Sequence, residues 1–416
     1  MMGVELPLIS SVIARLPDET VHLAAFGGVV FPLALLVESP VIMMLAASTA
    51  LCTNERAYQV LKSFMARLAF TMTLLHILFA FTPLYDQILV PLLDVPDEII
   101  EPSRIGFQLM LPWTWAIADR RFHQGVLIRF GKRRAIAVGT GVRLLTTLSV
   151  LSIGWLLRVD GASLAGASLA ISTISEAIYA RWQVRPVISG PLVEQPINKE
   201  VVQGFDLWKF YIPLAMTPFI TLAMHPIGAA GIDRMPSAVI SLAVWTPMSG
   251  LAFLCRSPGI AFNEVVISHW AQPDSRVILR RFAIVVGLIA TLILAILSLP
   301  PISRFWFGDI VGLPAALVEL GVNNIWFAIP IPLMTFLQSY YQGIAVSSHR
   351  TRMITESVVV YALVMVSVIA VGVSLQPPHG ITVVIIATSI GNFAQTLWLW
   401  FRCVSQKLEH NRTEIK

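Results

Sequence analysis

Residues 112–145 read PWTWAIADRRFHQGVLIRFGKRRAIAVGTGVRLL. Two apolar segments of helical length flank a short basic turn, and Arg120, Arg121 and Arg143 lie inside these segments rather than in the turn. A cation in the hydrocarbon core costs about 2.5 to 3.5 kcal/mol on insertion scales, so it usually faces a water-filled cavity or a charged partner. The stretch therefore predicts a membrane bundle with a polar interior.

The composition of the whole chain supports this class. Of its 416 residues 56% are hydrophobic and 13% are charged, whereas soluble domains carry about 25% charged residues. Several stretches run 18 or more residues with almost no charge, which is the length that crosses a hydrocarbon core. We therefore expect an all-α, multi-pass integral membrane protein. The net charge of +5 resides in the loops between spans, so we expect no nucleic-acid partner.

The apolar segments predict twelve transmembrane helices. A span needs about 20 residues, so the first is short for one. The predicted helices are 1–16, 23–50, 62–82, 105–129, 135–157, 162–184, 207–228, 236–256, 279–300, 319–346, 353–375 and 380–403.

Loop charges predict the orientation, because cytoplasmic loops of membrane proteins are enriched in Lys and Arg. Most of the 29 Lys and Arg lie in the turns after the even-numbered helices and in the C-terminal tail. The loop 83–104 is acidic instead. We therefore expect a plasma or inner membrane protein with both termini in the cytoplasm.

A weak internal repeat predicts two pseudo-symmetric lobes of six helices. Because six is an even number, both lobes would have the same orientation, and bent helices at matching positions would mark a substrate cavity. We expect an N-terminal lobe over 1–184, a cytoplasmic linker over 185–206, a C-terminal lobe over 207–403 and a cytoplasmic tail over 404–416. The matching residues, each pair 218 apart, are Pro112 and Pro330, Gln124 and Gln342, and Gly125 and Gly343.

The intramembrane arginines are the leading candidates for substrate binding. A guanidinium presents a fork of donors that suits carboxylate or phosphate oxygens. Arg120 and Arg143 each lie about 13 Å from the expected cytoplasmic face, at ~1.5 Å per residue, and positive charge exceeds negative there, which favours an anion. The expected substrate-binding residues are Arg120, Arg121, Arg143, His123, Gln124, Gln342 and Tyr341.

Four acidic residues are candidates for coupling transport to an ion. Glu5 and Glu38 each stand two residues before a proline near mid-membrane, where a carboxylate could carry H⁺ or bind Na⁺. Glu176 and Asp119 lie at the depth of the arginines. The alternative is that pairs such as Arg143 with Glu176, or Arg120 with Asp119, only tie helices together.

Metal, cofactor and enzyme chemistry find no support in the sequence. The three cysteines match no metal or redox spacing, and the eight histidines are scattered. No clustered His/Asp/Glu or Ser/Lys constellation is visible. We therefore expect no metal, no cofactor and no enzymatic activity.

Two runs of the sequence resemble a known family: LAAFGGVVFPLALLVESPVIMMLAASTAL (23–51) and RRFHQGVLIRFGKRRAIAVGTGVRL (120–144). They are similar to prokaryotic relatives of the progressive ankylosis protein, in the MATE-like multidrug/oligosaccharidyl-lipid/polysaccharide exporter superfamily. The resemblance implies a V-shaped bundle of two six-helix lobes that works by alternating access without ATP hydrolysis. It also implies export of anions such as pyrophosphate, nucleotides and citrate, and it makes Glu5 the match for a coupling acid in the first helix.

The sequence therefore favours a monomeric secondary transporter, an antiporter that exports a small organic or phosphate-containing anion. Two alternatives share the architecture. One is a proton- or sodium-coupled multidrug exporter in which Glu5 and Glu38 are central, and the other is a flippase for a lipid-linked precursor.

Overall fold

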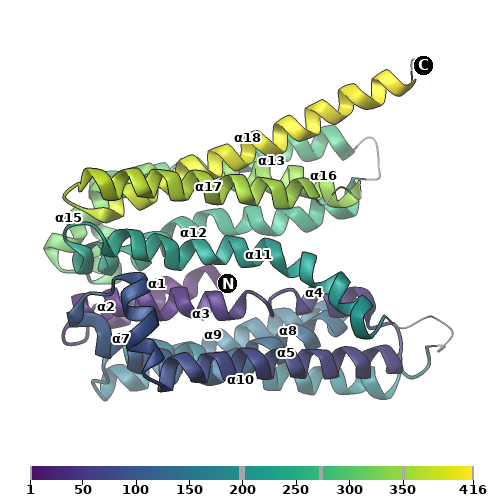
Figure 1. Cartoon of the computed structure of the whole chain (residues 1–416), viewed down its shortest axis with the longest axis horizontal. Coiled ribbons are helices and arrows are strands. Elements are labelled where there is room, and N and C mark those ends of the chain that lie inside the picture. The colour runs from purple at the N-terminus through teal and green to yellow at the C-terminus, as the bar shows by residue number, and fades with distance from the viewer. Residues whose placement is uncertain (1, 196–201, 271–274, 349, 351, 415–416) are drawn as a thin grey trace. The chain divides into compact units, whose positions relative to one another are not determined.

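Every regular element of the described chain is a helix (Figure 1). The chain divides into two compact units, Met1–Ala230 and Gly231–Lys416, which we call unit 1 and unit 2. The expected linker and tail lie partly outside the described residues. The residues that this computed structural model describes are 2–195, 202–270, 275–348, 350 and 352–414.

Unit 1 contains a bundle of long helices, among which α5, α8, α9 and α10 run side by side (Figure 1). Two short π-helical segments, η1 and η2, interrupt the regular helices. The elements are α1 Met2–Ile13, α2 Glu19–Ala25, η1 Phe26–Val30, α3 Phe31–Glu38, α4 Met44–Leu51, α5 Glu55–Phe81, η2 Tyr85–Leu89, α6 Val90–Leu93, α7 Asp97–Leu109, α8 Leu111–Arg129, α9 Arg133–Leu156, α10 Gly161–Ser189 and most of α11 Gly204–Asp233.

Unit 2 is built in the same way from long helices and short connecting ones. Its elements are α12 Ala238–His269, α13 Ser275–Ser298, α14 Pro300–Arg304, η3 Phe305–Val311, α15 Ala315–Asn324, η4 Ile325–Ala328, α16 Ile331–Ser347, α17 Arg352–Leu375 and α18 Gly380–Glu414.

Each of the twelve expected segments contains at least one helix, and ten helical stretches within the described ranges are long and apolar enough to cross a membrane. The first expected helix is the short α1, of 12 residues. Helix α8 is not among the ten because it carries Asp119, Arg120 and Arg121 in its middle. A criterion of apolarity alone therefore does not identify α8 as a membrane-spanning helix.

Several expected helices differ in their extent. The segment 23–50 is not one helix, because turns at 39–43 separate α3 from α4. Pro40 lies in this break, and a proline both lacks a backbone N–H and disfavours helical geometry at the residue before it. The expected helix 236–256 is longer than predicted, since α12 continues to His269.

The repeated prolines both mark the beginning of a helix. Pro112 lies in the first turn of α8, and Pro330 is the residue before α16. Proline is tolerated at this position because the first N–H groups of a helix have no intrahelical acceptor in any case. The matching prolines therefore restart a helix after a break in each unit.

The two units share a pattern of helix packing. In unit 1, α8 packs against α4, α5 and α10, and α10 packs against α9. In unit 2, α16 packs against α12, α13 and α18, and α18 packs against α17. Counted along the twelve expected helices, the fourth packs against the second, third and sixth. The tenth packs against the eighth, ninth and twelfth, which are each six places later.

The two units do not coincide with the lobes expected from the repeat, because the first half of α11 contacts unit 1. The Tyr211 hydroxyl donates to the Pro40 carbonyl at 2.6 Å. Phe64 packs edge-on against Trp208 and Tyr211, with ring centroids 4.8 and 5.1 Å apart. The contact boundary at residue 230 therefore lies beyond the expected linker.

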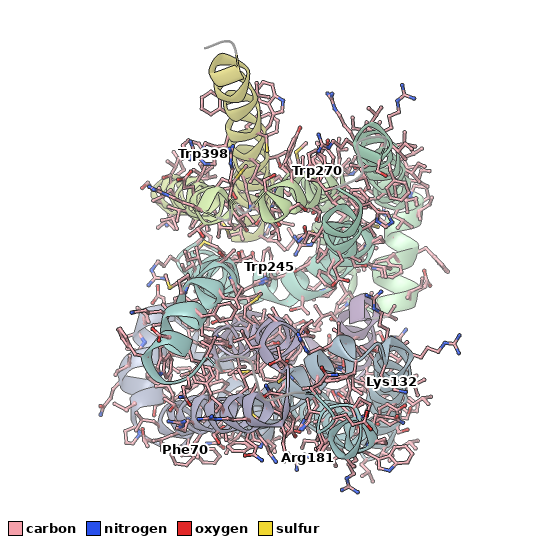
Figure 2. All side chains as sticks on the ribbon, turned by 90° about the vertical axis from the view of Figure 1, so that its right-hand side faces the viewer. Phe70, Lys132, Arg181, Trp245, Trp270 and Trp398 are labelled. Atoms are coloured by element: carbon pink, nitrogen blue, oxygen red, sulfur yellow. The ribbon has the colours of Figure 1, made fainter. Side chains whose placement is uncertain are left out.

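Large apolar side chains cover the outside of the helices. Phe70 of α5 is 62% exposed and points outward (Figure 2), and Leu288 of α13 and Leu363 of α17 are similarly exposed. Such a surface suits hydrocarbon rather than water, so the multi-pass membrane assignment rests on both the length of the helices and their outer faces.

Gly125 provides a test of the packing between α8 and α4. A methyl group at this position would collide with the Ser48 hydroxyl and with the Leu45 carbonyl, which belongs to the backbone. We expect Gly125→Ala to lower the free energy of unfolding by about 1 to 3 kcal/mol, as overpacking does. Thermal unfolding of the detergent-solubilised protein measures the change.

Gly141→Ala is the matched control. Gly141 lies in α9 with no atom within 4 Å of the added methyl group, so stability should stay the same or rise, because alanine favours a helix over glycine. Equal melting temperatures for both variants would contradict the close approach of α8 to α4.

Candidate functional site

A buried ion pair lies at the centre of unit 1. Arg120 of α8 is 1% exposed and Glu176 of α10 is 0% exposed. The Arg120 Nη1 donates to Glu176 Oε2 at 2.6 Å, and the Gln124 Nε2 donates to Glu176 Oε1 at 2.9 Å. Arg120 and Gln124 are four residues apart, so they project from the same face of α8 toward one carboxylate.

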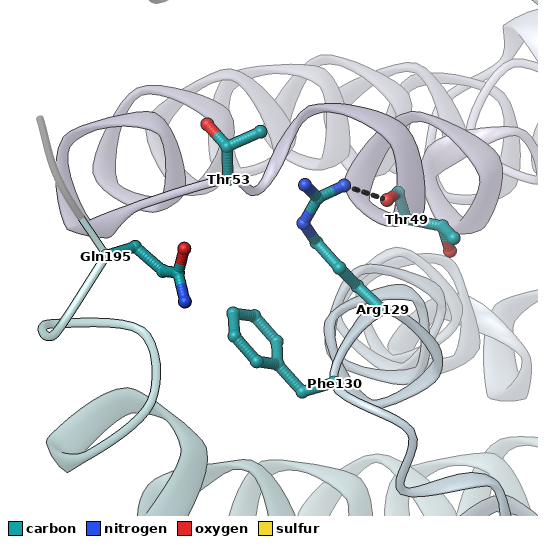
Figure 3. Close-up of a pocket in the computed structure, with 5 residues that line it drawn as sticks. All are labelled: Thr49, Thr53, Arg129, Phe130 and Gln195. Carbon is teal, nitrogen blue, oxygen red and sulfur yellow. Dashed lines mark hydrogen bonds between the residues drawn. The ribbon is translucent and has the colours of Figure 1, made fainter. Parts of the chain in front are cut away.

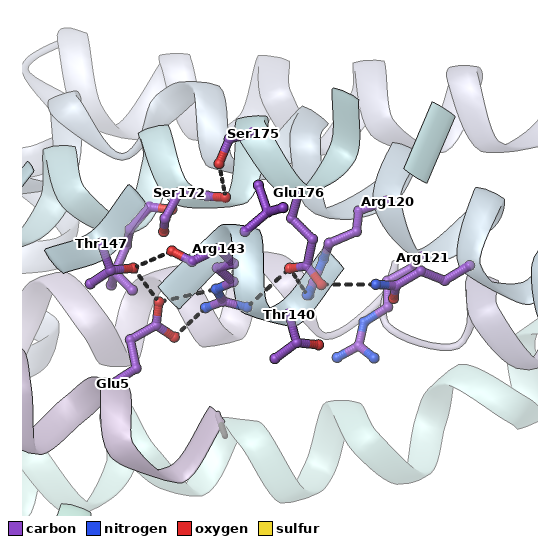
Figure 4. Close-up of polar contacts among 12 residues, drawn as sticks. Glu5, Arg120, Arg121, Thr140, Arg143, Thr147, Ser172, Ser175 and Glu176 are labelled. Atoms are coloured by element: carbon purple, nitrogen blue, oxygen red, sulfur yellow. Dashed lines mark hydrogen bonds and ion pairs between the residues drawn. The ribbon is translucent and has the colours of Figure 1, made fainter. Parts of the chain in front are cut away.

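A second ion pair extends the first across the bundle (Figure 4). Arg143 of α9 binds Glu5 of α1 with two hydrogen bonds, Nε to Oε1 at 3.0 Å and Nη2 to Oε2 at 2.5 Å. Thr147, one turn along α9, donates to Glu5 Oε1 at 3.1 Å. Arg143 Nη1 also lies 3.8 Å from Glu176 Oε2. Glu5, Arg143, Glu176 and Arg120, together with Gln124, form what we call the charged network.

Small residues allow α9 and α10 to bring this network together. A methyl group on Gly139 of α9 would lie 3.2 Å from the Tyr179 ring and 3.6 Å from the Glu176 Cγ. Ser175 of α10 donates to Thr146 Oγ1 at 3.0 Å. The helices therefore approach closely beside Glu176, and short polar side chains rather than apolar ones fill the space around the charges.

Arg121 and Glu38 form a looser pair beside the charged network. Arg121 Nη2 lies 3.8 Å from Glu38 Oε1, and the Arg121 side chain is 20% exposed. Its Nε is buried and has no hydrogen-bond acceptor in the described chain. Glu38 is the last residue of α3, next to the helix break at 39–43. This guanidinium thus has donor capacity that its carboxylate partner does not use.

Asp119 pairs with Arg181 rather than with its neighbour Arg120. The Arg181 Nη2 donates to Asp119 Oδ1 at 2.6 Å, and His123 Nδ1 lies 3.3 Å from Asp119 Oδ2. Arg181 is 56% exposed and lies at the periphery of unit 1 (Figure 2). Adjacent residues such as Asp119 and Arg120 point to different sides of a helix, so they do not pair with each other. The sequence gave no signal that Arg181, 62 residues away, is the partner of Asp119.

The charge count differs from the sequence-based expectation. An excess of positive charge was expected at the depth of the arginines, but Glu5 and Glu38 join Glu176 there, and each of the three carboxylates has an arginine within 4.0 Å. Three guanidiniums therefore face three carboxylates, and the described site is balanced in charge. The site therefore has donors left over after pairing rather than surplus positive charge.

The two expected site residues of unit 2 lie on α16. Tyr341 is half-buried and packs edge-on against Tyr340 with ring centroids 5.2 Å apart. Gln342, also half-buried, is followed by Gly343, which approaches Val266 of α12 closely. In the described part of unit 2, neither residue makes a hydrogen bond to a buried carboxylate like that of Gln124 to Glu176 in unit 1.

The counterpart of Arg120 in unit 2 is Gln338, which lies 218 residues later in the chain. The Gln338 Nε2 donates to the Asn392 carbonyl at 3.0 Å, to Asn392 Oδ1 at 3.2 Å and to Thr396 Oγ1 at 3.2 Å. The 218-residue register could have identified Gln338 from sequence. At this position the polar interior is charged in unit 1 and neutral in unit 2.

A polar cavity of about 510 Å³ lies where α4 and α8 end (Figure 3). It is lined by Thr49, Thr53, Arg129, Phe130 and Gln195. Arg129 Nη1 donates to the carbonyls of Thr49 and Ala50 at 2.8 and 3.0 Å. A cation suits the carbonyl end of a helix, so this arginine caps α4. Among the residues that the structure describes, no group of three or more His, Cys, Asp or Glu could hold a metal ion.

Comparison with known proteins shows the fold. The chain has a TM-score of 0.72 and 11% identity with an inward-facing multidrug resistance MATE family transporter of the MOP superfamily, covering 97% of this chain and 95% of that one. For the lipid II flippase MurJ, in an inward closed conformation, the TM-score is 0.64 and the identity is 12%. The match covers 97% of this chain and 87% of that one. For a MOP superfamily transporter from Pyrococcus furiosus, the TM-score is 0.60 and the identity is 12%. The match covers 98% of this chain and 96% of that one.

The fold is therefore MATE-like, as expected. No protein-family model matches the chain, and no curated protein matches its sequence. The resemblance to progressive ankylosis relatives remains an expectation.

Glu176 should be the most sensitive position of the charged network. Glu176→Gln leaves the guanidiniums of Arg120 and Arg143 close together with one carboxylate fewer. Removing one partner of a buried pair costs about 3 to 5 kcal/mol, so we expect a large fall in the melting temperature of the purified protein. Replacing Arg120 and Glu176 together by methionine should recover part of the loss.

The exposed pair of Arg304 and Glu319, with a distance of 2.8 Å, is the control. Glu319→Gln should change the melting temperature little, because solvent screens exposed pairs. If Glu176→Gln were equally mild, the network would not hold α8, α9 and α10 together.

Proposed function

We propose that the chain is a secondary active transporter that works by alternating access and exports a small organic or phosphate-containing anion, such as citrate, pyrophosphate or a nucleotide-like molecule. The MATE-like fold supports transport, since the similar structures include MATE family transporters and a flippase. Arg121 carries the anionic part of the proposal, because its partly exposed guanidinium lies 3.8 Å from its carboxylate and keeps a donor without an acceptor.

The unused donors have an energetic meaning. A buried N–H group without an acceptor costs about 1 to 3 kcal/mol. The Nε atoms of both Arg120 and Arg121 are in this state within the described chain. A carboxylate or phosphate oxygen would satisfy such a donor and would receive a charge-assisted hydrogen bond. Arg120 is fully buried and locked to Glu176, so Arg121 is the residue that meets the anion and Arg120 positions its helix.

The charged network supplies a means of coupling. A proton bound by Glu5 would neutralise the carboxylate that holds Arg143, which lies 3.0 Å away. The freed guanidinium fork could then bind an anion or pull more strongly on Glu176, 3.8 Å distant. Such a change of partners gives the network two arrangements, and a bound proton or Na⁺ would shift the population between them.

Arg121→Ala tests the anion site. One charge-assisted contact contributes about 1.5 to 3 kcal/mol, so citrate or pyrophosphate binding should weaken roughly ten- to a hundredfold. Arg121→Lys should restore only part of the affinity, because an ammonium cannot make the forked contact. Isothermal titration of purified protein measures both.

Arg67→Ala is the matched control for Arg121→Ala. Arg67 is an exposed arginine of α5 whose Nε donates to the Ser63 carbonyl within its own helix. Its loss should leave anion binding unchanged. If Arg121→Ala and Arg67→Ala bound citrate and pyrophosphate as the wild type does, the anion site at Arg121 would be refuted.

The second candidate is a proton- or sodium-coupled multidrug exporter. It is favoured by the four carboxylates buried inside unit 1, Glu5, Glu38, Asp119 and Glu176, and by the similarity to a multidrug resistance transporter. A lipid-linked precursor flippase has the fold similarity to MurJ in its favour. Uptake of citrate, pyrophosphate, ATP and a cationic dye into proteoliposomes separates these substrate classes.

Glu5→Gln tests the coupling. Glutamine keeps the size of the side chain and an oxygen toward Arg143 but does not titrate, so transport should lose its pH dependence while the protein still folds. The control is Glu264→Gln, which changes an exposed carboxylate of α12. Unchanged pH dependence in Glu5→Gln, measured by uptake into proteoliposomes over a range of pH, would assign Glu5 a structural role only.

A further inference from the structure

Arg256 is an arginine of the bundle that the sequence places in a cytoplasmic turn. The predicted helix 236–256 ends at this residue, whereas α12 continues for another 13 residues to His269. Arg256 therefore lies inside a helix, within the apolar stretch Ala238–Ile267 that is long enough to cross a membrane. An ionisable residue in such a stretch is a candidate for function.

The helix continues because local contacts compensate for Pro258 and Gly259. Proline cannot donate to the carbonyl four residues earlier, and the Ser257 hydroxyl donates to that carbonyl, on Leu254, at 3.1 Å. Gly259 serves helix packing, since a methyl group there would lie 2.9 Å from the Phe336 ring of α16. The Pro-Gly pair resembles a turn signal, but here it allows α12 and α16 to approach closely.

The surroundings of Arg256 contain aromatic rings rather than carboxylates. Its guanidinium lies over the Phe253 ring, 5.4 Å from the centroid. Tyr361 of α17 is close enough to interact with it electrostatically. Across the described parts of the chain, Arg256 makes no ion pair or hydrogen bond. In contrast, Arg120, Arg121 and Arg143 of unit 1 each have a glutamate within 4.0 Å.

Tyr361 of unit 2 corresponds in depth to Arg143 of the charged network in unit 1. Tyr361 lies nine residues after Arg352, the first residue of α17, and Arg143 lies ten residues after Arg133, the first residue of α9. At ~1.5 Å per residue both are about 14 Å from the beginning of their helix. Tyr361 is also 218 residues after Arg143, which is the register of the repeat.

We propose that Arg256 and the Tyr361 hydroxyl bind the carboxylate or phosphate group of the transported anion in unit 2. A guanidinium offers two parallel donors to such a group, the phenol hydroxyl offers a third, and the Phe253 ring, 5.4 Å from the guanidinium, stabilises the cation. The inference rests on the proposed function and adds a second contact point to it. The same chemistry would also bind the phosphate of a lipid headgroup, and the experiment distinguishes the two sources.

The test compares Arg256→Gln, Arg256→Lys and Tyr361→Phe with wild type, using pyrophosphate and citrate as probes. The protein is studied in detergent and in vesicles of the zwitterionic lipid phosphatidylcholine, where no anionic headgroup competes. Arg256→Gln should weaken pyrophosphate binding roughly ten- to a hundredfold, Arg256→Lys should weaken it less, and Tyr361→Phe should have a smaller effect. Arg281→Gln, which changes an exposed arginine of α13, should leave binding unchanged.

Thermal unfolding separates a binding role from a structural one. Arg256→Gln removes a charge that has no carboxylate partner in the described residues, so the melting temperature without ligand should not fall. Pyrophosphate should raise the melting temperature of wild type by mass action and should raise that of Arg256→Gln much less. A large fall of the unliganded melting temperature, with pyrophosphate affinity retained, would make Arg256 a structural residue and overturn the proposal.

Two further outcomes separate this inference from the function on which it rests. If wild type binds pyrophosphate and Arg121→Ala weakens this binding, but Arg256→Gln does not, the anion-export function stands and the site at Arg256 is refuted. If wild type binds neither pyrophosphate nor citrate, the proposed function fails and this site fails with it. If Arg256→Gln retains pyrophosphate binding but loses the rise in melting temperature that anionic lipid gives the detergent-solubilised wild type, the occupant is a lipid headgroup and the substrate-contact proposal is refuted.

Discussion

The cost of placing a charge away from water is the constraint on which the interior of unit 1 depends. Several kcal/mol per unpaired ion would make Arg120 or Arg143 alone intolerable at such burial. Pairing with Glu176 and Glu5 meets that cost only if α1, α8, α9 and α10 all hold their positions. Gly139 fits the same demand, because its lack of a side chain lets α9 approach α10 closely beside Glu176.

A charge-balanced network behaves differently from a surplus of positive charge. Surplus charge would attract an anion permanently, whereas a balanced set offers further donors when one carboxylate is neutralised or moves. This property suits a transporter, which must bind its substrate in one state and release it in another. The polar interiors of the two units also differ in charge. Arg120 pairs with Glu176 in unit 1, whereas the corresponding Gln338 of unit 2 pairs with the neutral Asn392.

The sequence predicted what depends on local composition. Apolar length identified the membrane class and the approximate positions of the helices, and the 218-residue register placed Pro112 and Pro330 at equivalent helix starts. Pairings between distant residues were not predictable, because partners such as Asp119 and Arg181, 62 residues apart, are chosen by helix rotation. The predicted helix end at residue 256 was wrong, because a serine beside Pro258 and a packing glycine after it keep α12 helical to His269.

The contrast between paired and unpaired arginines provides a criterion for function that charge alone does not. A guanidinium such as that of Arg143, whose Nε and Nη2 both bind Glu5, is explained by its carboxylate and by the helices it joins. Arg121 is paired loosely, and Arg256 has aromatic neighbours but no carboxylate partner among the described residues. An aromatic ring offsets only part of the cost of a desolvated cation. An added anion would offset the remainder, and the proposed binding sites therefore lie at Arg121 and Arg256, the arginines whose pairing inside the described chain is weakest.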